Sequence, residues 1–504
     1  MDVLTTRVAL PQAGADRAMG RLSTTNTPAL PAVAVILAAG IAAVWIAVQL
    51  LRRDQALATP AYDQAFFQQV IWNLDHGRGF ANSFNQNSFL GVHFSPLLLV
   101  PAALELAWPD PRLLTLINSA AVALTAPAAF LFLRAAFAPS RLGAYLAAGL
   151  AAALPFTPTM QEAARAAFHP ETVALPAAFV AGWAGLTGRR TAMWAAAAIP
   201  LLAKEDQVYT VAVIGLLLAA RGRPGMRRHG VLLVAVAVAW GMALFGVVMP
   251  GLRAGAATDT TSYYAWMGPF PAQVLAPFRE PSAVVAQLTM VEGWGAAAGL
   301  MLCVCGLPLL RPAWALLVLP PLVANLLSRH YPQPELHLQY GLLLVVPTVV
   351  AAAMGGRTAL AVARRRLGRT PPGVRQRLAM ALSAAAVPAL VLGAAAGSLP
   401  PAAHASSAFV REPGWDRLTS VTRIIPPGAP VDVDDGLAAP LASRPTIFVL
   451  PRDCADCYVV VDAASTGWSF MSATERAALL SALPAERRLL ADDGRFEVWS
   501  PVDG

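Results

Sequence analysis

The chain has 504 residues, of which 57% are hydrophobic and only 13% are charged. Soluble proteins are about a quarter charged, so the composition excludes an ordinary soluble enzyme and indicates a polytopic membrane protein. The net charge of +8 does not argue for a nucleic-acid partner, because in a membrane protein the placement of arginine matters more than its total.

The N-terminal segment, residues 1–29, is polar and contains Arg7, Arg17 and Arg21. The apolar run that follows, 31–51, is too long for the core of a signal peptide, and no convincing cleavage site follows it. We expect a cytoplasmic tail followed by an uncleaved first span.

Apolar runs of a length that can cross about 30 Å of hydrocarbon recur along the chain. They predict about eleven transmembrane helices, at roughly 30–51, 113–134, 141–157, 172–187, 191–203, 207–221, 230–249, 293–310, 313–328, 337–355 and 378–398. With the N-terminus inside, nineteen Lys and Arg residues before residue 401 fall in inside segments and nine in outside segments. This bias supports the orientation, and it makes 30–400 a transmembrane domain with long external loops at 52–112 and 250–292.

The first external loop contains the stretch "AYDQAFFQQVIWNLDHG", residues 61–77. Its apolar residues recur at helical spacing, which predicts an amphipathic helix lying in the membrane interface. Asp63 near its start has three interpretations: a helix N-cap, a general base or a metal ligand. The following stretch, 94–108, is short for a span and contains Glu105, so we expect a surface or re-entrant helix.

Other ionisable residues gather on the same external side, where they are costly and indicate a functional site. Lys204, Glu205 and Asp206 interrupt an apolar stretch; they form either a solvated turn or a site where the cation holds a phosphate. Arg329, His330, Tyr331 and His337 suit a phosphate or pyrophosphate headgroup, or else anchor the chain at the interface.

Three further residues, His93, His169 and Glu171, could join Asp63 in a divalent-metal site, although their spacing is no known ligand pattern. For "HPET", a helix start is the simpler interpretation. Metal binding therefore stays open. Tyr62, next to Asp63, is a candidate substrate-binding residue. The amide-rich stretch "FANSFNQNSF" (80–89) suits contacts with sugar hydroxyls, or simply an exposed loop.

The tail, 401–504, has nine Arg and fourteen Asp or Glu, a net charge of −5. Strand-like runs at 430–435, 446–451 and 458–463 precede a helix at about 473–483, for which Ser472 and Glu475 have capping-box spacing. A hairpin is expected at Asp493-Gly494. We expect a small extracytoplasmic α/β domain.

Four cysteines are present. Cys303 and Cys305 lie in an apolar run and are expected to be inert core residues. Cys454 and Cys457 form C-x-x-C, which suits a local disulfide, a redox pair or half a zinc site. Zinc is disfavoured because no second C-x-x-C or His pair lies nearby.

Long stretches of the sequence resemble a family of predicted bacterial membrane proteins known only as a domain of unknown function. The resemblance rests on "YDQAFFQQVIWNLDHGRGF", "GVHFSPLLLVPAALELAWPDPRLLTLINSAAV", "AAFHPETVALP" and "LLAKEDQVYTVAVIGL". It covers most of the chain and includes "IIPPGAPVDVDD" at the start of the tail.

More distantly, the layout is similar to the C-type (GT-C) membrane glycosyltransferases, which transfer a sugar from a polyprenyl-phosphate donor. In these enzymes the first external loop carries an acidic residue near a juxtamembrane helix, and a "PPL"-like helix follows. The resemblance implies that Asp63 is the acidic residue and acts as base or orients the acceptor, with Lys204 and Arg329–His330 as candidates for the donor phosphate. This chain departs from the pattern in having no paired "DE" or "ED" in the loop and "HFSP" for the proline pair.

Three functions compete. The first is a GT-C-like glycosyltransferase in the cell membrane, with a lipid-linked sugar donor, surrounding membrane lipids and an envelope acceptor. The second is a transporter or lipid flippase, which should place ionisable residues near mid-membrane on discontinuous helices. The third is a non-catalytic envelope protein that tolerates replacement of Asp63 and Lys204 by alanine. Clustering of the ionisable residues toward one side favours the enzyme.

Overall fold

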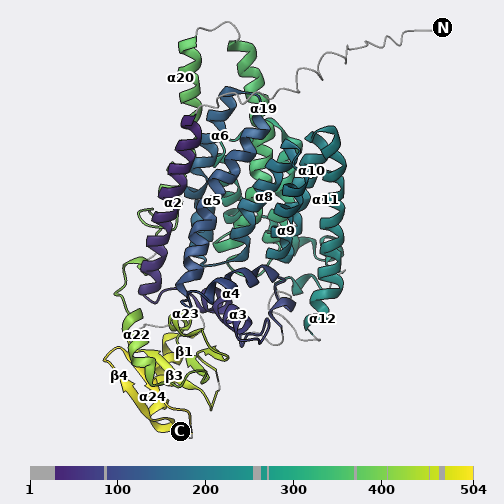
Figure 1. The fold of residues 1–504 in the computed structure, drawn as a ribbon. Helices are drawn as coiled ribbons and strands as arrows, with labels where there is room; N and C mark the ends of the chain where they lie inside the picture. The colour runs from purple at the N-terminus through teal and green to yellow at the C-terminus, as the bar shows by residue number, and fades with distance from the viewer. Residues whose placement is uncertain are drawn as a thin grey trace, which may run out of the picture.

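The computed structural model describes residues 29–84, 88–253, 263–268, 272–367, 372–405, 407–452, 454–464 and 471–502. The predicted cytoplasmic tail, 1–29, therefore lies almost entirely outside the described residues, as do parts of the 80–89 stretch and of the 250–292 loop. Figure 1 shows a helical bundle, a layer of short helices below it, and a small sheet domain at the C-terminus.

Long helices form the body of the bundle. They are α2 (Ala29–Gln55), α5 (Arg112–Phe137), α6 (Arg141–Ala153), α8 (Pro170–Thr187), α9 (Arg190–Ala203), α10 (Val208–Arg221), α11 (Pro224–Ala243), α16 (Val291–Cys303), α19 (Val345–Leu367), α20 (Pro372–Ser383) and α21 (Val387–Ala396). Shorter helices connect them: α7 (Pro158–Arg165), α12 (Met249–Arg253), α14 (Ala276–Arg279), α15 (Pro281–Leu288), α17 (Pro312–Ala315) and α18 (Leu319–Leu326).

Within the described chain, five helical stretches are long and apolar enough to cross a membrane: Ala29–Gln55, Arg112–Phe137, Arg141–Arg165, Pro224–Arg253 and Leu338–Arg366. The other six predicted spans coincide with shorter helices, some joined through 3-10 turns such as Leu316–Val318 and Ala384–Ala386. The many-helix membrane architecture is thus confirmed, while the number of crossings stays a prediction.

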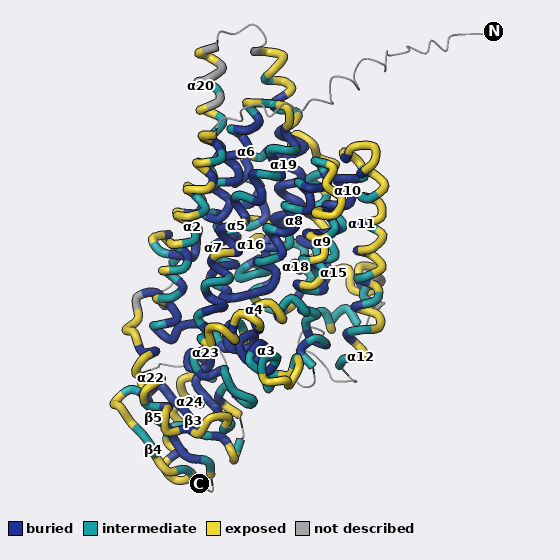
Figure 2. Tube along the Cα trace, in the orientation of Figure 1, coloured by how far each residue is buried: buried dark blue, intermediate teal, exposed yellow. Residues whose placement is uncertain are grey.

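The pattern of exposure fits helices surrounded by lipid. Ile36, Leu37 and Ile41 of α2 and Val238 and Met242 of α11 are exposed, and Figure 2 shows exposed residues along both helices at the sides of the bundle. By contrast, α5 is buried over most of its length. Apolar side chains on the outside of a bundle are stable only when hydrocarbon covers them.

The first loop folds into a layer between the bundle and the sheet domain (Figure 1). It comprises the π-helical turn η1 (Ala61–Ala65), α3 (Phe66–Asp75), the 3-10 turns η2 (Phe89–Gly91) and η3 (Pro96–Leu98), and α4 (Leu99–Glu105). The prediction that the apolar face of 61–77 lies in the membrane interface is wrong. Phe66, Phe67, Val70 and Ile71 are buried in a protein core, because other parts of the loop and the start of α5 cover them.

The neighbouring α4 behaves as expected for a surface helix. Leu99, Val100 and Leu104 are exposed, which suits contact with lipid. Glu105 is nevertheless buried and accepts a hydrogen bond of 2.6 Å from the Gln68 amide. The helix therefore has an apolar outer face and a polar anchor on the protein side.

The C-terminal domain contains α22 (Trp415–Val421), β1 (Val431–Val433), α23 (Ala438–Leu441), β2 (Ile447–Val449), β3 (Tyr458–Asp462), α24 (Ala473–Glu486), β4 (Leu489–Asp492) and β5 (Phe496–Trp499). The strand order is β2-β1-β3-β5-β4. β1 is parallel to β2 and β3, with Val431 opposite Ile447 and Tyr458, whereas β5 is antiparallel to β3 and β4. The predicted small α/β domain is confirmed.

Local sequence signals in this domain also act as expected. Ser472 and Glu475 form the capping box of α24, and the β4–β5 hairpin turns at Gly494, whose φ is +84°. A disulfide joins Cys454 and Cys457, so the motif is not half of a zinc site; a local disulfide and the oxidised form of a redox pair both have this bond. In the bundle, Cys303 is buried as expected, but Cys305 is exposed, because the chain turns out of its helix there with a positive φ.

The C-terminal domain packs directly on the first loop. Leu57, Ala61 and Ala65 lie in the same apolar core as Trp415 and Phe496. The Ala61 N–H donates to Asp435 at 2.9 Å, and the Gly414 N–H donates to the Gln55 carbonyl at 2.7 Å. The tail and the first loop therefore share one apolar core, and the tail helps to position the loop.

Candidate active site

The candidate residues come from segments far apart in the sequence that meet at one end of the bundle. Asp63 lies in η1, His169 and Glu171 lie at the start of α8, and Lys204, Glu205 and Asp206 lie between α9 and α10. This end is the one covered by α3, α4 and the C-terminal domain (Figure 1).

Asp63 and His169 are paired. His169 Nε2 lies 3.5 Å from Asp63 Oδ1, and the two side chains are 6% and 15% exposed, respectively. The Phe67 ring packs edge-on against the imidazole with 5.3 Å between centroids. Burial raises the pKa of Asp63, while the charges of His169 and Arg53 oppose the rise.

The N-cap interpretation of Asp63 is wrong. Pro60 holds the cap position of η1 and no side chain caps that turn. The Ala61 N–H is instead bound by Asp435 of the C-terminal domain. Asp63 is therefore not committed to a helix end.

Lys204 connects two carboxylates. Its ammonium contacts Glu171 and lies 3.7 Å from Asp206 Oδ2. Although burial opposes the charge, Glu171 and Asp206 raise the pKa of Lys204 well above its usual value. Glu171 is almost fully covered, whereas the side chain of Asp206 is 37% exposed, so the network opens outward at Asp206.

Glu205 has a different contact. Its carboxylate lies 3.0 Å from His93 Nδ1 and accepts the Phe94 N–H at 2.9 Å. Burial opposes ionisation of Glu205, but His93 and its hydrogen bond lower the pKa of that carboxyl. This pair fastens the "HFSP" segment to the α9–α10 connection.

The four candidate residues of the 329–337 segment make other contacts in the described part of the chain. The Arg329 guanidinium lies over the Trp266 ring at 4.7 Å, His330 stacks on Tyr263 at 4.0 Å, and Tyr331 is exposed. His337 lies 3.5 Å from Glu162 and 3.1 Å from Glu335. The four residues therefore do not form one phosphate site: Arg329 and His330 lie on aromatic rings, whereas His337 lies beside two glutamates.

Two tyrosines lie between these groups. The Tyr340 hydroxyl is within electrostatic reach of Lys204, Asp63 and Glu171, and that of Tyr264 is within reach of Asp206 and Lys204. Gln333 also donates to the Tyr264 oxygen at 2.9 Å. Tyr62, by contrast, is half exposed and packs against Phe84 at 5.6 Å.

Sequence reasoning missed Arg53 and Asp435. Arg53, in the last turn of α2, is buried, donates to the carbonyls of Ala58 and Arg165, and is close enough to influence Asp63 and Asp435. Burial raises the pKa of Asp435 to about 6, opposed by the Ala61 hydrogen bond and by Arg53. For Arg53, the available signal was the pair "RD" (53–54) at the end of an apolar run, but charged residues at that position are equally typical of the end of any transmembrane helix.

Among the described residues, no group of three or more His, Cys, Asp or Glu side chains is arranged to hold a metal ion. The four suggested ligands instead form separate pairs, Asp63 with His169, Glu171 with Lys204, and His93 with Glu205. A metal requirement stays an untested prediction.

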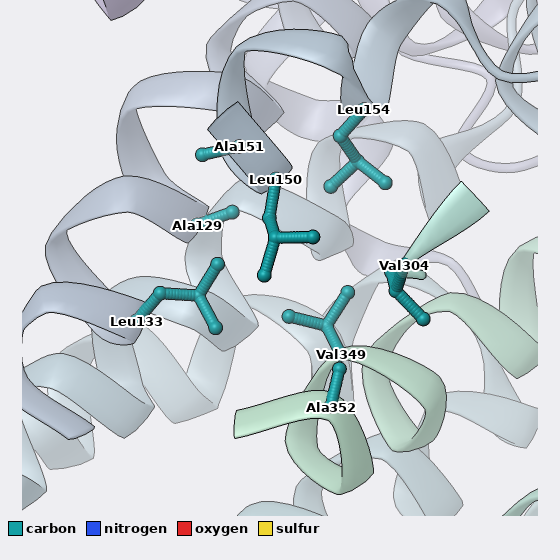
Figure 3. Close-up of a pocket in the computed structure, with 8 residues that line it drawn as sticks. All are labelled: Ala129, Leu133, Leu150, Ala151, Leu154, Val304, Val349 and Ala352. Carbon is teal, nitrogen blue, oxygen red and sulfur yellow. The ribbon is translucent and has the colours of Figure 1, made fainter. Parts of the chain in front are cut away.

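A gap inside the bundle is lined by apolar side chains, in contrast to the charged candidate site. Figure 3 shows that aliphatic side chains line it, and it is too narrow to hold a water-sized molecule. Its lining residues are Ala129, Leu133, Leu150, Ala151, Leu154, Val304, Val349 and Ala352. This gap offers no polar group to a transported solute.

Comparison with known proteins places this geometry in context. The pattern of a family described as "Predicted membrane protein (DUF2079)" matches residues 53–487. ArnT from Cupriavidus metallidurans in the apo state is 13% identical, with a TM-score of 0.50 over 91% of this chain and 97% of that chain. ArnT from the same organism bound to undecaprenyl phosphate gives 13% identity and 0.48 over 91% and 98%. No curated protein matches the sequence. The likeness to the apo structure shows an ArnT-like fold.

Proposed function

The chain belongs to the DUF2079 family of predicted membrane proteins, and we propose that it is a GT-C-type glycosyltransferase. It takes a sugar from a polyprenyl-phosphate donor and passes it to an acceptor of the cell envelope on the extracytoplasmic face. The observation that carries the proposal is the Asp63–His169 pair at the end of the bundle covered by the first loop and the C-terminal domain.

Asp63 acts as the general base. Its carboxylate takes the proton of the acceptor hydroxyl while that oxygen bonds to the anomeric carbon of the sugar. The bond from this carbon to the donor phosphate breaks, and the electron pair leaves with the polyprenyl phosphate. A base is most effective when its pKa approaches the working pH, and burial shifts the pKa of Asp63 in that direction.

His169 is the positioning residue for Asp63. Its Nε2 faces the carboxylate, and Phe67 holds the ring in place. A buried carboxylate needs such a polar neighbour, because an unpaired buried charge is costly. Glu171, two residues along the chain, links the pair to Lys204.

We assign binding of the donor phosphate to Arg329 and His330 rather than to Lys204. Arg329 is exposed and its planar guanidinium suits a phosphate. Lys204 is already neutralised by Glu171 and Asp206, so we assign it the role of holding these carboxylates in place. The fold likeness to apo ArnT agrees with a lipid-linked donor, since ArnT has also been solved with undecaprenyl phosphate.

The experiment uses the purified full-length chain in lipid nanodiscs with a panel of polyprenyl-phosphate sugars, with and without EDTA. We expect one donor to be consumed, with loss of turnover in Asp63→Asn and retention in Asp75→Asn, which removes the same charge from the other end of the first-loop helix. Loss of wild-type turnover with EDTA would establish the metal requirement. Translocation of a donor across the bilayer without cleavage would favour the flippase instead.

A further inference from the structure

The opposite end of the bundle contains a second feature, a hollow lined by arginine. Its volume is about 340 Å³, and Arg221, Arg311, Arg357 and Arg365 line it together with Met354, Thr358, Ala361 and Val362. The arginines come from the end of α10, the residue before α17, and α19. Figure 1 places the end of α19 far from the C-terminal domain.

The positive charge here has no acidic partner among the described residues that line the hollow. The connecting segments at this end, 134–141, 187–191, 221–230, 310–312 and 355–378, contain no Asp or Glu either. Four cations that converge on one hollow repel each other unless an anion lies among them.

The arginines keep donors available. Arg357 donates to the Ala136 carbonyl at 2.7 Å, and Arg311 donates to the Thr358 hydroxyl at 2.7 Å. Each guanidinium has five N–H groups, so these bonds use a small part of the capacity. Within the described chain, no hydrogen bond or ion pair involves the side chains of Arg221 and Arg365.

We propose that this hollow binds the phosphate group of an anion, with the headgroup of an anionic phospholipid or a soluble phosphate as its source. The volume of about 340 Å³ is far above the roughly 10–15 Å³ of such space that one water molecule needs, which leaves room for a phosphate with attached groups. Guanidinium groups match phosphate oxygens in geometry, and basic pockets between membrane helices bind anionic headgroups. General enrichment of arginine at cytoplasmic ends would not require four side chains around one hollow.

Native mass spectrometry of the full-length, delipidated protein tests the proposal with three probes: phosphatidylglycerol, phosphatidylcholine and inorganic pyrophosphate. The pocket variant is Arg221→Gln/Arg365→Gln. The control is Arg190→Gln/Arg228→Gln, which removes the same charge from the same end but not from the hollow. Melting temperatures identify any variant that fails to fold, and single substitutions replace a pair that does.

We expect phosphatidylglycerol to bind in preference to phosphatidylcholine, with affinity about thirtyfold lower in the pocket variant and changed less than about twofold in the control. Pyrophosphate binding with the same dependence on the pocket arginines would support a soluble source. Equal losses in both variants, or no binding of either phosphate probe, would overturn the proposal.

Discussion

At the residue scale, the position of Asp63 depends on an irregular turn. Asp63 lies at the centre of a five-residue π-helix that precedes α3, and such π-helical turns are rare and frequent at functional sites. Asp435 from the C-terminal domain binds the first N–H of this turn. A residue more than 370 positions away in the chain therefore helps to set the direction of the proposed base.

The pH dependence of turnover follows from the Asp63 environment. Because burial raises the pKa of Asp63 above its ordinary 3.8, the base form appears only above that value, and kcat/KM should rise with pH through a limb above pH 3.8. The charge of His169 opposes the rise, so His169→Gln should move the limb to higher pH. A pH–rate profile measures both, and a limb that stays in place or moves downward would contradict the positioning role.

Glu105 provides a prediction about stability. Burial raises its pKa to about 7, partly offset by the Gln68 hydrogen bond. The folded chain then holds a proton that the unfolded chain releases above about pH 4.5, so stability is complete below that pH and falls as the pH rises toward 7. The loss reaches about 3 kcal/mol at most.

Glu105→Gln removes this titration and retains an acceptor for Gln68. Denaturant unfolding at pH 5 and pH 8 should show the wild type losing stability relative to the variant over this interval. Parallel pH curves for the two proteins would show that Glu105 is ionised in the folded state.

At the element scale, α3 lies between two domains. Its aromatic residues pack into the loop core. Gln68 and Gln69 reach the C-terminal domain, where the Gln68 amide donates to Ser443 and the Gln69 amide donates to the Pro445 carbonyl. The Gln69 amide also donates to Ser83 of the first loop. Both faces of this amphipathic helix are therefore covered by protein.

Gln69→Ala should loosen the C-terminal domain. The substitution leaves the Ser83 N–H and the Pro445 carbonyl without their partner, at a cost of about 1–3 kcal/mol. Limited proteolysis should then release the tail faster than in the wild type. Asn73→Ala, which breaks a bond within the loop to Ala81, is the control and should leave the release rate unchanged.

The sequence was informative about elements and less so about their partners. The capping box at Ser472, the Asp493-Gly494 hairpin and the helices of the predicted spans depend on local signals, and all are present. The apolar face of Phe66 to Leu74 correctly predicted a helix but not what packs on that face. Periodicity shows which face of a helix is apolar, and it does not show whether protein or lipid covers that face.

For the candidate site, too, the sequence predicted the location but not the contacts. The expected residues do lie together at one end of the bundle: Asp63, His169, Glu171, Lys204 and Asp206. Spacing could not predict the pairings, since they join the first loop, α8 and the α9–α10 connection. Nor could it reveal Arg53, which the end of α2 brings near Asp63, or Asp435, which comes near Asp63 when the C-terminal domain packs on the first loop.

At the scale of the whole molecule, charge and covalent chemistry support one orientation. The tail is acidic and holds the Cys454–Cys457 disulfide, and disulfides persist in oxidising compartments outside the cytoplasm. The other end of the bundle holds the acid-free arginine segments, as cytoplasmic ends do.

Labelling of intact bacteria tests this orientation. Glu486→Cys in the tail and Arg228→Cys at the start of α11, both exposed, are each introduced into a chain with Cys303 and Cys305 replaced by alanine. A membrane-impermeant maleimide should label the first variant in whole cells and the second only after lysis. The reverse pattern would place the candidate site in the cytoplasm, away from any envelope acceptor.

The most direct test of the central claim is the initial rate of donor consumption by Asp63→Asn, compared with Asp75→Asn in identical nanodiscs. Loss of a general base lowers turnover by about 10²- to 10⁴-fold, so Asp63→Asn should fall at least about a hundredfold while Asp75→Asn stays near the wild-type rate. Equal rates for the two variants would contradict the assignment of Asp63 as the catalytic base.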